Sequence, residues 1–342
     1  MNEHNTSVPA IPKRVLLTGA GFSHNFGGYL AEEMWVKLFN SPFIQRSADL
    51  KAMLFQERDY ESIYERALRK PDDDPDKSAI FTAVLDSYRQ MDEILRRWPY
   101  ETVGQFAISY LRLRDFLEMF SGSEDVPGLI FTLNQDVFLE RHFADDLGIS
   151  LPWLPVKAWN FGMNQPSLDE ITLTLPEQED QHDAFQKLRR AKLYYIKLHG
   201  SSNWKRHDGS ETLVIGHGKA QSIANEPVLI HNFKLFQDTI FHQGCQLLTI
   251  GYGFGDQHIN EQLAMAIMQN RLKLYILDPS RPYSFLERLT RELGSKLLEK
   301  GLAGYFQCTL HELLPADESV SPSWLELEKL YFEGCGEPTG KG

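Results

Sequence analysis

Cysteine is scarce in this chain, which has three cysteines among 342 residues, at positions 245, 308 and 335. A zinc ribbon needs four paired cysteines, so three scattered ones cannot build it. An odd and sparse set also argues against a disulfide framework and for a reducing compartment. We therefore expect a cytoplasmic protein without structural zinc.

Long apolar segments are lacking as well. Residues 1–12 are polar and have no apolar centre of the kind found in a signal peptide, and no stretch reaches the roughly twenty apolar residues of a membrane span. Positive charge is in deficit: 35 Lys and Arg stand against 47 Asp and Glu, a formal net charge of −12. Because such a surface repels nucleic acid and anionic membranes, we expect neither as a direct partner.

A strand that runs into a glycine turn lies near the start, in the stretch RVLLTGAGFS at residues 14–23. Gly19 and Gly21 let the backbone turn tightly and approach a ligand closely. Ser23 is a good N-cap for a helix expected over about residues 27–40, and a helix N-terminus after such a turn suits a pyrophosphate. The dinucleotide fingerprint would require a third glycine where His24 stands.

The pattern of strand, turn and helix then repeats along the chain. It predicts an α/β fold with a doubly wound, mostly parallel sheet and helices on both faces. We expect core strands at 129–133, 193–198, 246–250 and 273–277, and a short strand at 228–230. Residues 47–119 look helical, with a turn at 71–75. Residues 152–176 predict a long loop over a site, and 178–192 a helix.

This pattern suggests three parts. Residues 14–40 and 126–280 form the expected nucleotide-binding core, and residues 41–125 form a helical insertion. Residues 281–342 form a C-terminal extension of helix and strand that ends in a glycine-rich tail.

Polar residues follow the predicted strands where ligands bind in such sheets, at the carboxyl ends. They are Asn134 and Asp136, then His199, then Gly251, Gly255 and Asp256, and finally Asp278. Each has a plain structural reading: the glycines could only form turns, Asn134, Asp136 and Asp278 could cap helices or turns, and His199 could be a buried structural histidine. Their common position at strand ends favours a shared site.

Asp256 and His258 could also bind a metal ion. They are two residues apart, and the sequence offers no third ligand near them. A protein metal site of this kind needs at least three ligands. We therefore expect no metal.

Three motifs in order resemble the sirtuins: Gly19-Ala20-Gly21-Phe22-Ser23, Thr132-Leu133-Asn134-Gln135-Asp136 and His199-Gly200. The resemblance implies a sirtuin-type, Rossmann-like fold that binds NAD. It implies that Gly19, Ala20, Gly21 and Ser23 hold the pyrophosphate. By the same analogy Asp136 holds the carboxamide, Asn134 positions the ribose or a water, and His199 accepts a proton. From their places at strand ends we also expect Gly251, Gly255 and Asp256 to bind the nucleotide, and Asp278 could accept from the adenosine ribose.

The departures from the deacylase sirtuins are the missing zinc ribbon and the run from Gly251 to Asn260. That run resembles bacterial sirtuin-like proteins of antiphage defence, which break down NAD. Residues 25–28, 33–35 and 59–64 resemble the sirtuin-like subunit encoded beside a HerA-type ATPase. The resemblance implies an NAD glycohydrolase with NAD as its substrate, gated by oligomerisation or by such a partner. Two alternatives stay open: an NAD-dependent protein deacylase and a module that binds NAD or ADP-ribose without turnover.

Overall fold

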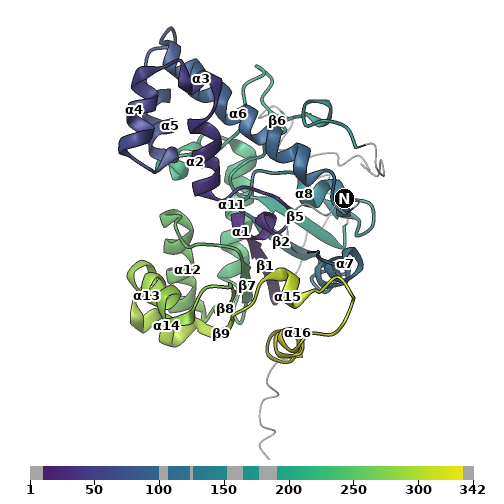
Figure 1. Ribbon diagram of the computed structural model, residues 1–342. Coiled ribbons are helices and arrows are strands. Elements are labelled where there is room, and N and C mark those ends of the chain that lie inside the picture. Colours follow the sequence, from purple (N-terminus) through teal and green to yellow (C-terminus); the bar gives the residue numbers. More distant parts are fainter. Residues whose placement is uncertain (1–10, 100–106, 124–125, 152–164, 177–190, 334–342) are drawn as a thin grey trace, which may run out of the picture.

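The computed structural model describes residues 11–99, 107–123, 126–151, 165–176 and 191–333. Within these residues the chain forms a seven-stranded sheet in the order β3-β5-β2-β1-β7-β8-β9, and every neighbouring pair is parallel (Figure 1). Its strands are β1 Arg14–Thr18, β2 Gly128–Thr132, β3 Ile149–Ser150, β5 Leu193–Lys197, β7 Gln246–Ile250, β8 Lys273–Leu277 and β9 Leu302–Phe306. Two short strands pair separately, β4 Leu173–Thr174 and β6 Trp204–Lys205. The prediction of a doubly wound parallel sheet is confirmed.

Helices lie on both faces of this sheet. Between β1 and β2 come α1 Ala20–His24, α2 Ala31–Phe39, α3 Pro42–Gln45, α4 Ala48–Gln56, α5 Tyr60–Leu68, α6 Pro75–Leu95 and α7 Tyr110–Glu118. Between β2 and β7 come α8 Phe138–Phe143, the 3-10 turn η1 Asp169–Ile171, α10 Lys219–Ala224 and α11 Pro227–Ile240. The remainder are α12 Gln257–Asn270, α13 Pro282–Leu293, α14 Ser295–Gly301, α15 Leu310–Leu313, α16 Pro322–Leu327 and the π-helical turn η2 Glu328–Glu333.

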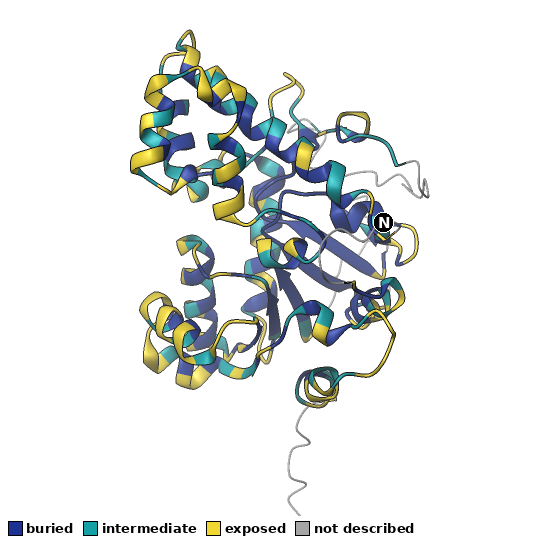
Figure 2. Cartoon of the chain, in the orientation of Figure 1, coloured by how far each residue is buried: buried dark blue, intermediate teal, exposed yellow. Residues whose placement is uncertain are grey.

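The strands are buried on both sides because their side chains alternate between two apolar cores (Figure 2). In β1, Leu16 packs with residues of α2, α6 and α8, whereas Val15 and Leu17 pack with residues of α11, α12 and α13. A fully buried side chain of this kind contributes about 1.5–3 kcal/mol, so a run of apolar residues in a central strand ties both helical layers to the sheet.

The helices α3, α4, α5 and α6, inserted between β1 and β2, begin at capping side chains. Ser47, Asp59 and Asp74 each accept a hydrogen bond from a backbone N–H of the first turn of α4, α5 and α6. The expected turn at residues 71–75 separates α5 from α6. This group projects to one side of the sheet (Figure 1), and its α5 and α6 border the site described below.

Three local predictions are wrong. The first helix, α1, begins at Ala20, so Ser23 lies inside it rather than capping a later helix, and its hydroxyl bonds other side chains instead. The next helix begins at Ala31 instead of about residue 27, because the chain turns at Gly27, where φ is +98°. Residues 228–230 are helical: Pro227 starts α11, in which Val228, Leu229 and Phe236 are buried at helical spacing.

Two other predictions fall largely outside the described residues. Only 165–176 of the expected loop is described, and it carries η1 and β4. Only 191 and 192 of the expected helix at 178–192 are described. The strands β3 and β9 were not predicted; β3 has two residues, and β9 pairs with β8 through an irregular register. No helix in the described part of the chain has the length and apolar character to span a membrane.

Candidate functional site

A cavity of about 1050 Å³ lies at the carboxyl ends of the strands. It is bordered by the segments that follow β1, β2, β5, β7, β8 and β9, and these strands are consecutive neighbours in the sheet. All of the site residues expected from the sequence line it: Gly19, Ala20, Gly21, Ser23, Asn134, Asp136, His199, Gly251, Gly255, Asp256 and Asp278. Residues more than 250 positions apart in the chain are thus brought to one space.

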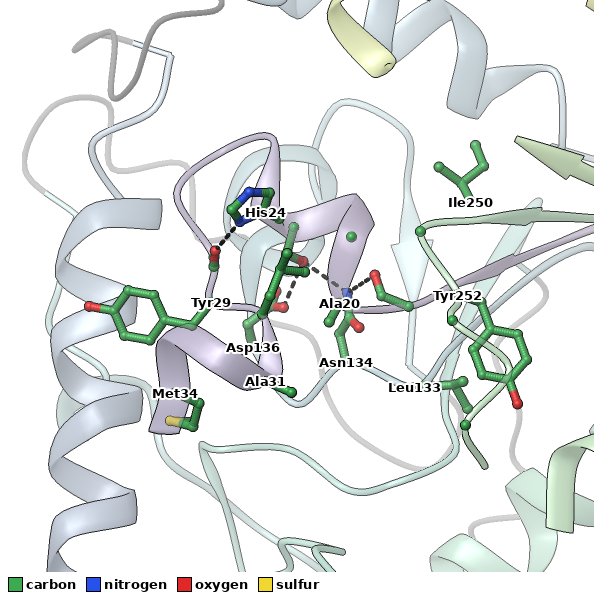
Figure 3. A pocket seen from close by; sticks show the side chains of 18 of the residues that line it. Ala20, His24, Tyr29, Ala31, Met34, Leu133, Asn134, Asp136, Ile250 and Tyr252 are labelled. Carbon is green, nitrogen blue, oxygen red and sulfur yellow. Dashed lines mark hydrogen bonds between the residues drawn. The ribbon is translucent and has the colours of Figure 1, made fainter. Parts of the chain in front are cut away.

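One side of the cavity, here called the β1–β2 wall, consists of residues 19–23 and 133–136. Asn134 donates from Nδ2 to the carbonyl oxygen of Gly19 and to Oγ of Ser23, each over 2.9 Å. Ser23 in turn donates to Oδ2 of Asp136 over 2.7 Å, and Oδ1 of Asp136 accepts from the backbone N–H of Phe138. Asn134 and Asp136 therefore lie side by side against α1 (Figure 3), with nearly all their bonds made inside the wall.

A buried ion pair between Lys197 and Glu140 lies next to the β1–β2 wall. Lys197, fully buried in β5, donates from Nζ to the carbonyl oxygen of Asp136 and lies 3.0 Å from Oε1 of Glu140. Burial raises the pKa of Glu140, and the ammonium of Lys197 opposes that shift. Removing either Lys197 or Glu140 would leave the other charge buried and unpaired, which is costly. The ion pair therefore keeps Lys197 in position, and its hydrogen bond holds the backbone carbonyl of Asp136 in place.

The two glycine turns pack directly on each other. Gly19 donates its backbone N–H to the carbonyl oxygen of Ile250, and Gly21 donates to that of Gly251. A Cβ on Gly19 would come within 2.6 Å of the Gly251 carbonyl oxygen, and one on Gly21 within 2.7 Å of the Gly251 Cα. The glycines are therefore required first for the contact between two turns, a reason that the sequence does not reveal.

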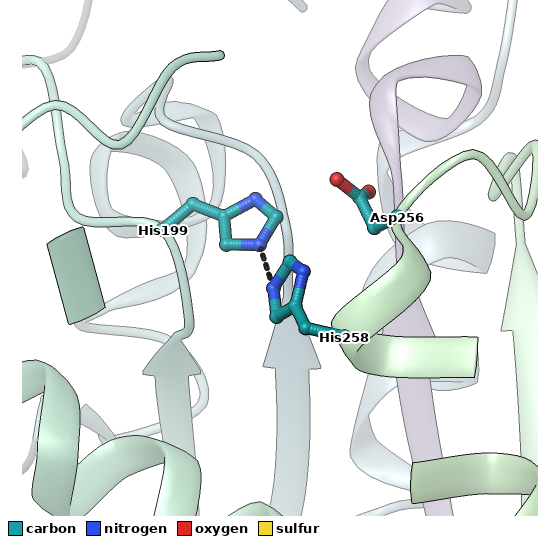
Figure 4. A group of neighbouring side chains, drawn as sticks. All are labelled: His199, Asp256 and His258. Carbon is teal, nitrogen blue, oxygen red and sulfur yellow. Dashed lines mark hydrogen bonds between the residues drawn. The ribbon is translucent and has the colours of Figure 1, made fainter. Parts of the chain in front are cut away.

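A second part of the cavity lining, here called the β5–β7 wall, carries charge and consists of His199, Lys219 and Asp256. Lys219 extends from α10 between two carboxylates, 2.6 Å from Oδ1 of Asp256 and 2.9 Å from Oε2 of Glu61 in α5. His258 lies next to His199, and the Nε2 atoms of the two rings are 3.0 Å apart (Figure 4). This wall joins the sheet, α10, α12 and the helices inserted after β1.

The structure overturns the argument that Asp256 and His258 have no third ligand near them. One potential ligand atom from each of His199, Asp256 and His258 lies within 4.8 Å of the others. Three such groups could hold a divalent ion in principle. The ammonium of Lys219 already pairs with Asp256, however, and a second cation there would meet its repulsion.

Burial decides the protonation of the two histidines. His199 is 3% exposed, and burial lowers its pKa to about 3, although the charge of Asp256 acts in the opposite direction. Burial also lowers the pKa of His258. Burial raises the pKa of Asp256, but the net shift is downward, with the charge and the hydrogen bond of Lys219 among its causes. At neutral pH both imidazoles are therefore neutral and Asp256 is ionised.

Several residues of the site were missed by the sequence analysis. Gln135 donates from Nε2 to the carbonyl oxygens of His199 (3.0 Å) and Val214 (2.8 Å), and its Oε1 accepts from the hydroxyl of Tyr88 in α6. Its place inside the motif at residues 132–136 was a usable signal. Lys219 and Glu61 gave no signal, because an isolated Lys or Glu on a helix is ordinarily a solvated residue.

A doubly wound sheet with polar strand ends around one deep cavity defines a nucleotide-binding class of α/β protein. Residues 128–300, just over half of the chain, match the model of the family described as SIR2-like domain, and the chain belongs to this family. Domains of this family bind NAD, which supports an NAD-related function. The match begins at β2 and does not include the glycine turn at residues 19–23. This turn is assigned to the site because it lines the cavity in the structure. A search of curated proteins returned no match.

The residues present fit NAD as the molecule bound. The cavity is large for a small-molecule site, and the ends of six neighbouring strands contribute to it. Asp278, after β8, lines it at a strand end where an acidic residue can accept from a ribose hydroxyl. One of its oxygens, Oδ1, accepts from the backbone N–H of Ser280 over 2.8 Å, so the turn before Pro279 also uses this side chain.

Proposed function

We propose that this protein is an NAD glycohydrolase that converts NAD to ADP-ribose and nicotinamide. The observation that carries the proposal is the arrangement of Asn134, Asp136 and His199 around one cavity, on neighbouring strand ends. These residues are separated by up to 65 positions in the chain (199 − 134). A protein that only binds the nucleotide has no need for a neutral imidazole in the same cavity as a buried amide and carboxylate.

Cleavage of nicotinamide from NAD requires little acid catalysis. Nicotinamide in NAD is already a cationic leaving group, and glycosidic cleavage passes through an oxocarbenium-like transition state. The protein must orient the ribose, bind the carboxamide and admit water. Asn134 has its Nδ2 engaged twice, which leaves Oδ1 to meet a ribose hydroxyl or the attacking water.

His199 supplies the base. A neutral imidazole can take the proton of a ribose hydroxyl or of water, and burial keeps it neutral throughout the physiological range. Asp136 lies beside Asn134 and would hold the carboxamide, although both of its oxygens already accept bonds from the chain itself. In this role a bound carboxamide competes with Ser23 for Oδ2.

We further propose that the activity serves antiphage defence by depleting NAD, in the manner of abortive infection. An enzyme of this kind would kill its host if it were always active, so a partner or a homo-oligomer must control it. The resemblance at residues 25–28, 33–35 and 59–64 favours a HerA-type ATPase as that partner. Residues 59–64 fall at the start of α5, which borders the cavity through Tyr60 and Glu61.

The test is nicotinamide release from NAD by the purified chain, alone and with a candidate ATPase, in wild type, His199→Ala and Asn134→Ala. We expect each variant to lose 10²–10⁴-fold in rate, the range of a general base or a positioning group. His242→Ala, an exposed histidine outside the cavity, is the matched control and should keep full activity. Release of deacylated peptide instead of free ADP-ribose would identify a deacylase, and NAD binding without loss would identify a sensing module.

A further inference from the structure

The imidazole rings of His199 and His258 are joined by one hydrogen bond. A separation of 3.0 Å between two Nε2 atoms is a hydrogen-bond distance, and two neutral imidazoles can bridge it only if one donates and the other accepts. The tautomer of His199 is therefore tied to that of His258. The backbone of Leu133 raises the pKa of His199, against the larger effect of burial.

His258 reaches His199 from outside the cavity. It lies in the first turn of α12 and is half-buried, with its ring centroid 5.1 Å from that of His199 and 5.8 Å from that of Phe233 in α11. His199 is among the residues that line the cavity, whereas His258 is not among the described lining residues. Figure 4 shows the two rings meeting at their Nε2 atoms, with Asp256 at the start of the same helix as His258.

We propose that His258 is a positioning residue that sets the tautomer and orientation of His199 for proton transfer, an inference that rests on the NAD glycohydrolase activity proposed above. When the substrate O–H bond breaks, the proton forms an N–H bond on His199, and the electron pair stays on oxygen. The charged groups that face the pair are Asp256 and Glu261 of α12 and Lys219 of α10; α11 contributes the apolar ring of Phe233. The carboxylate of Asp256 stabilises the imidazolium, and His258 keeps its ring in place.

Two substitutions separate hydrogen bonding from packing. His258→Phe keeps an aromatic ring against Phe233 and removes the nitrogen, whereas His258→Gln keeps an amide that can bond Nε2 of His199. We expect His258→Phe to lower kcat for NAD cleavage roughly 10–100-fold with little change in KM, and His258→Gln to remain within about fivefold of wild type. Because His258 acts through His199, the double variant His199→Ala/His258→Phe should be no slower than His199→Ala alone.

A second measurement does not depend on turnover. Long-range ¹H–¹⁵N spectra of histidine-labelled protein report the tautomer of each ring, and we expect His258→Phe to shift the His199 ring signals while the exposed His242→Gln leaves them unchanged. If wild type releases no nicotinamide but His199 still shifts, the proposed function fails and the pairing stands. The inference is overturned if His258→Phe retains wild-type kcat, if Phe and Gln variants lose activity equally, or if the His199 signals do not move.

Discussion

The two walls of the cavity are built by different means. The β1–β2 wall is held by hydrogen bonds among short side chains and backbone carbonyls, as in the bonds from Asn134 to Gly19 and Ser23. The β5–β7 wall is held by charge, with Lys219 between Asp256 and Glu61. The first wall comes from two adjacent strand ends, whereas the second gathers side chains from four separate segments.

Because of this difference, we expect the two walls to have different roles in the reaction. Short, neutral hydrogen bonds fix atoms within a few tenths of an ångström and suit the orientation of a ribose. A cluster of charges around a buried imidazole instead adjusts how readily a proton moves. The glycine turn that leads to Asp256 packs on the β1–β2 wall at Gly19 and Gly21, so the contact at Gly251 connects the two walls.

The largest predicted effect follows from this contact. Gly251 has a φ of +65°, and a Cβ there would lie 2.1 Å from the backbone nitrogen of Phe22. Because the atoms that this Cβ would meet are backbone atoms of α1 and cannot move aside, we expect Gly251→Ala to lower the free energy of unfolding by about 3 kcal/mol or more, measured by denaturant titration. NAD affinity should fall with it, since the walls are forced apart.

Gly253→Ala is the matched control for that substitution. Gly253 lies in the same turn, but a Cβ there meets no atom within 4 Å and its φ is not positive. We expect a change within about 0.5 kcal/mol, as for other surface substitutions. Equal destabilisation by both variants would show that the turns do not depend on their contact.

The same contrast explains what the sequence could predict. The β1–β2 wall follows from local motifs, because a strand and the turn after it are contiguous in the chain, and parallel strand ends meet at one edge. The β5–β7 wall could not be assembled in this way: Lys219 lies in a short helix, and His258 reaches His199 only because α12 begins beside β5. The errors at Ser23 and residues 228–230 have a local cause, since a Ser before an apolar run suits a cap or a helix interior, and three apolar residues suit a strand or a helix.

A smaller effect concerns acid stability. His199 has a pKa of about 3 in the folded protein against 6.5 in the unfolded chain. Below pH 6.5 the unfolded chain binds a proton that the folded protein does not, so the free energy of unfolding falls as pH falls, by about 1.4 kcal/mol per pH unit for this one group. Between pH 6 and pH 4, unfolding curves of His199→Asn should show a slope shallower by that amount.

The buried His142, whose pKa burial lowers to about 4, keeps its own slope in that variant and serves as an internal reference. A wild-type slope that persists in His199→Asn would mean that burial does not lower the pKa of His199 in the folded protein.

The last prediction is that removal of metal ions does not change the rate of NAD cleavage. The ammonium of Lys219 lies 2.6 Å from Asp256 and neutralises the carboxylate that a divalent ion would require. We therefore expect treatment with a chelator, followed by dialysis, to change NAD cleavage less than about twofold, and elemental analysis to find less than one equivalent of bound transition metal. If activity is instead lost and then restored by Zn²⁺ or Mn²⁺, His199, Asp256 and His258 form a metal centre, and the hydrogen bond between the histidines belongs only to the metal-free state. The comparison of the walls would then change, because the second wall would be organised by an ion rather than by Lys219.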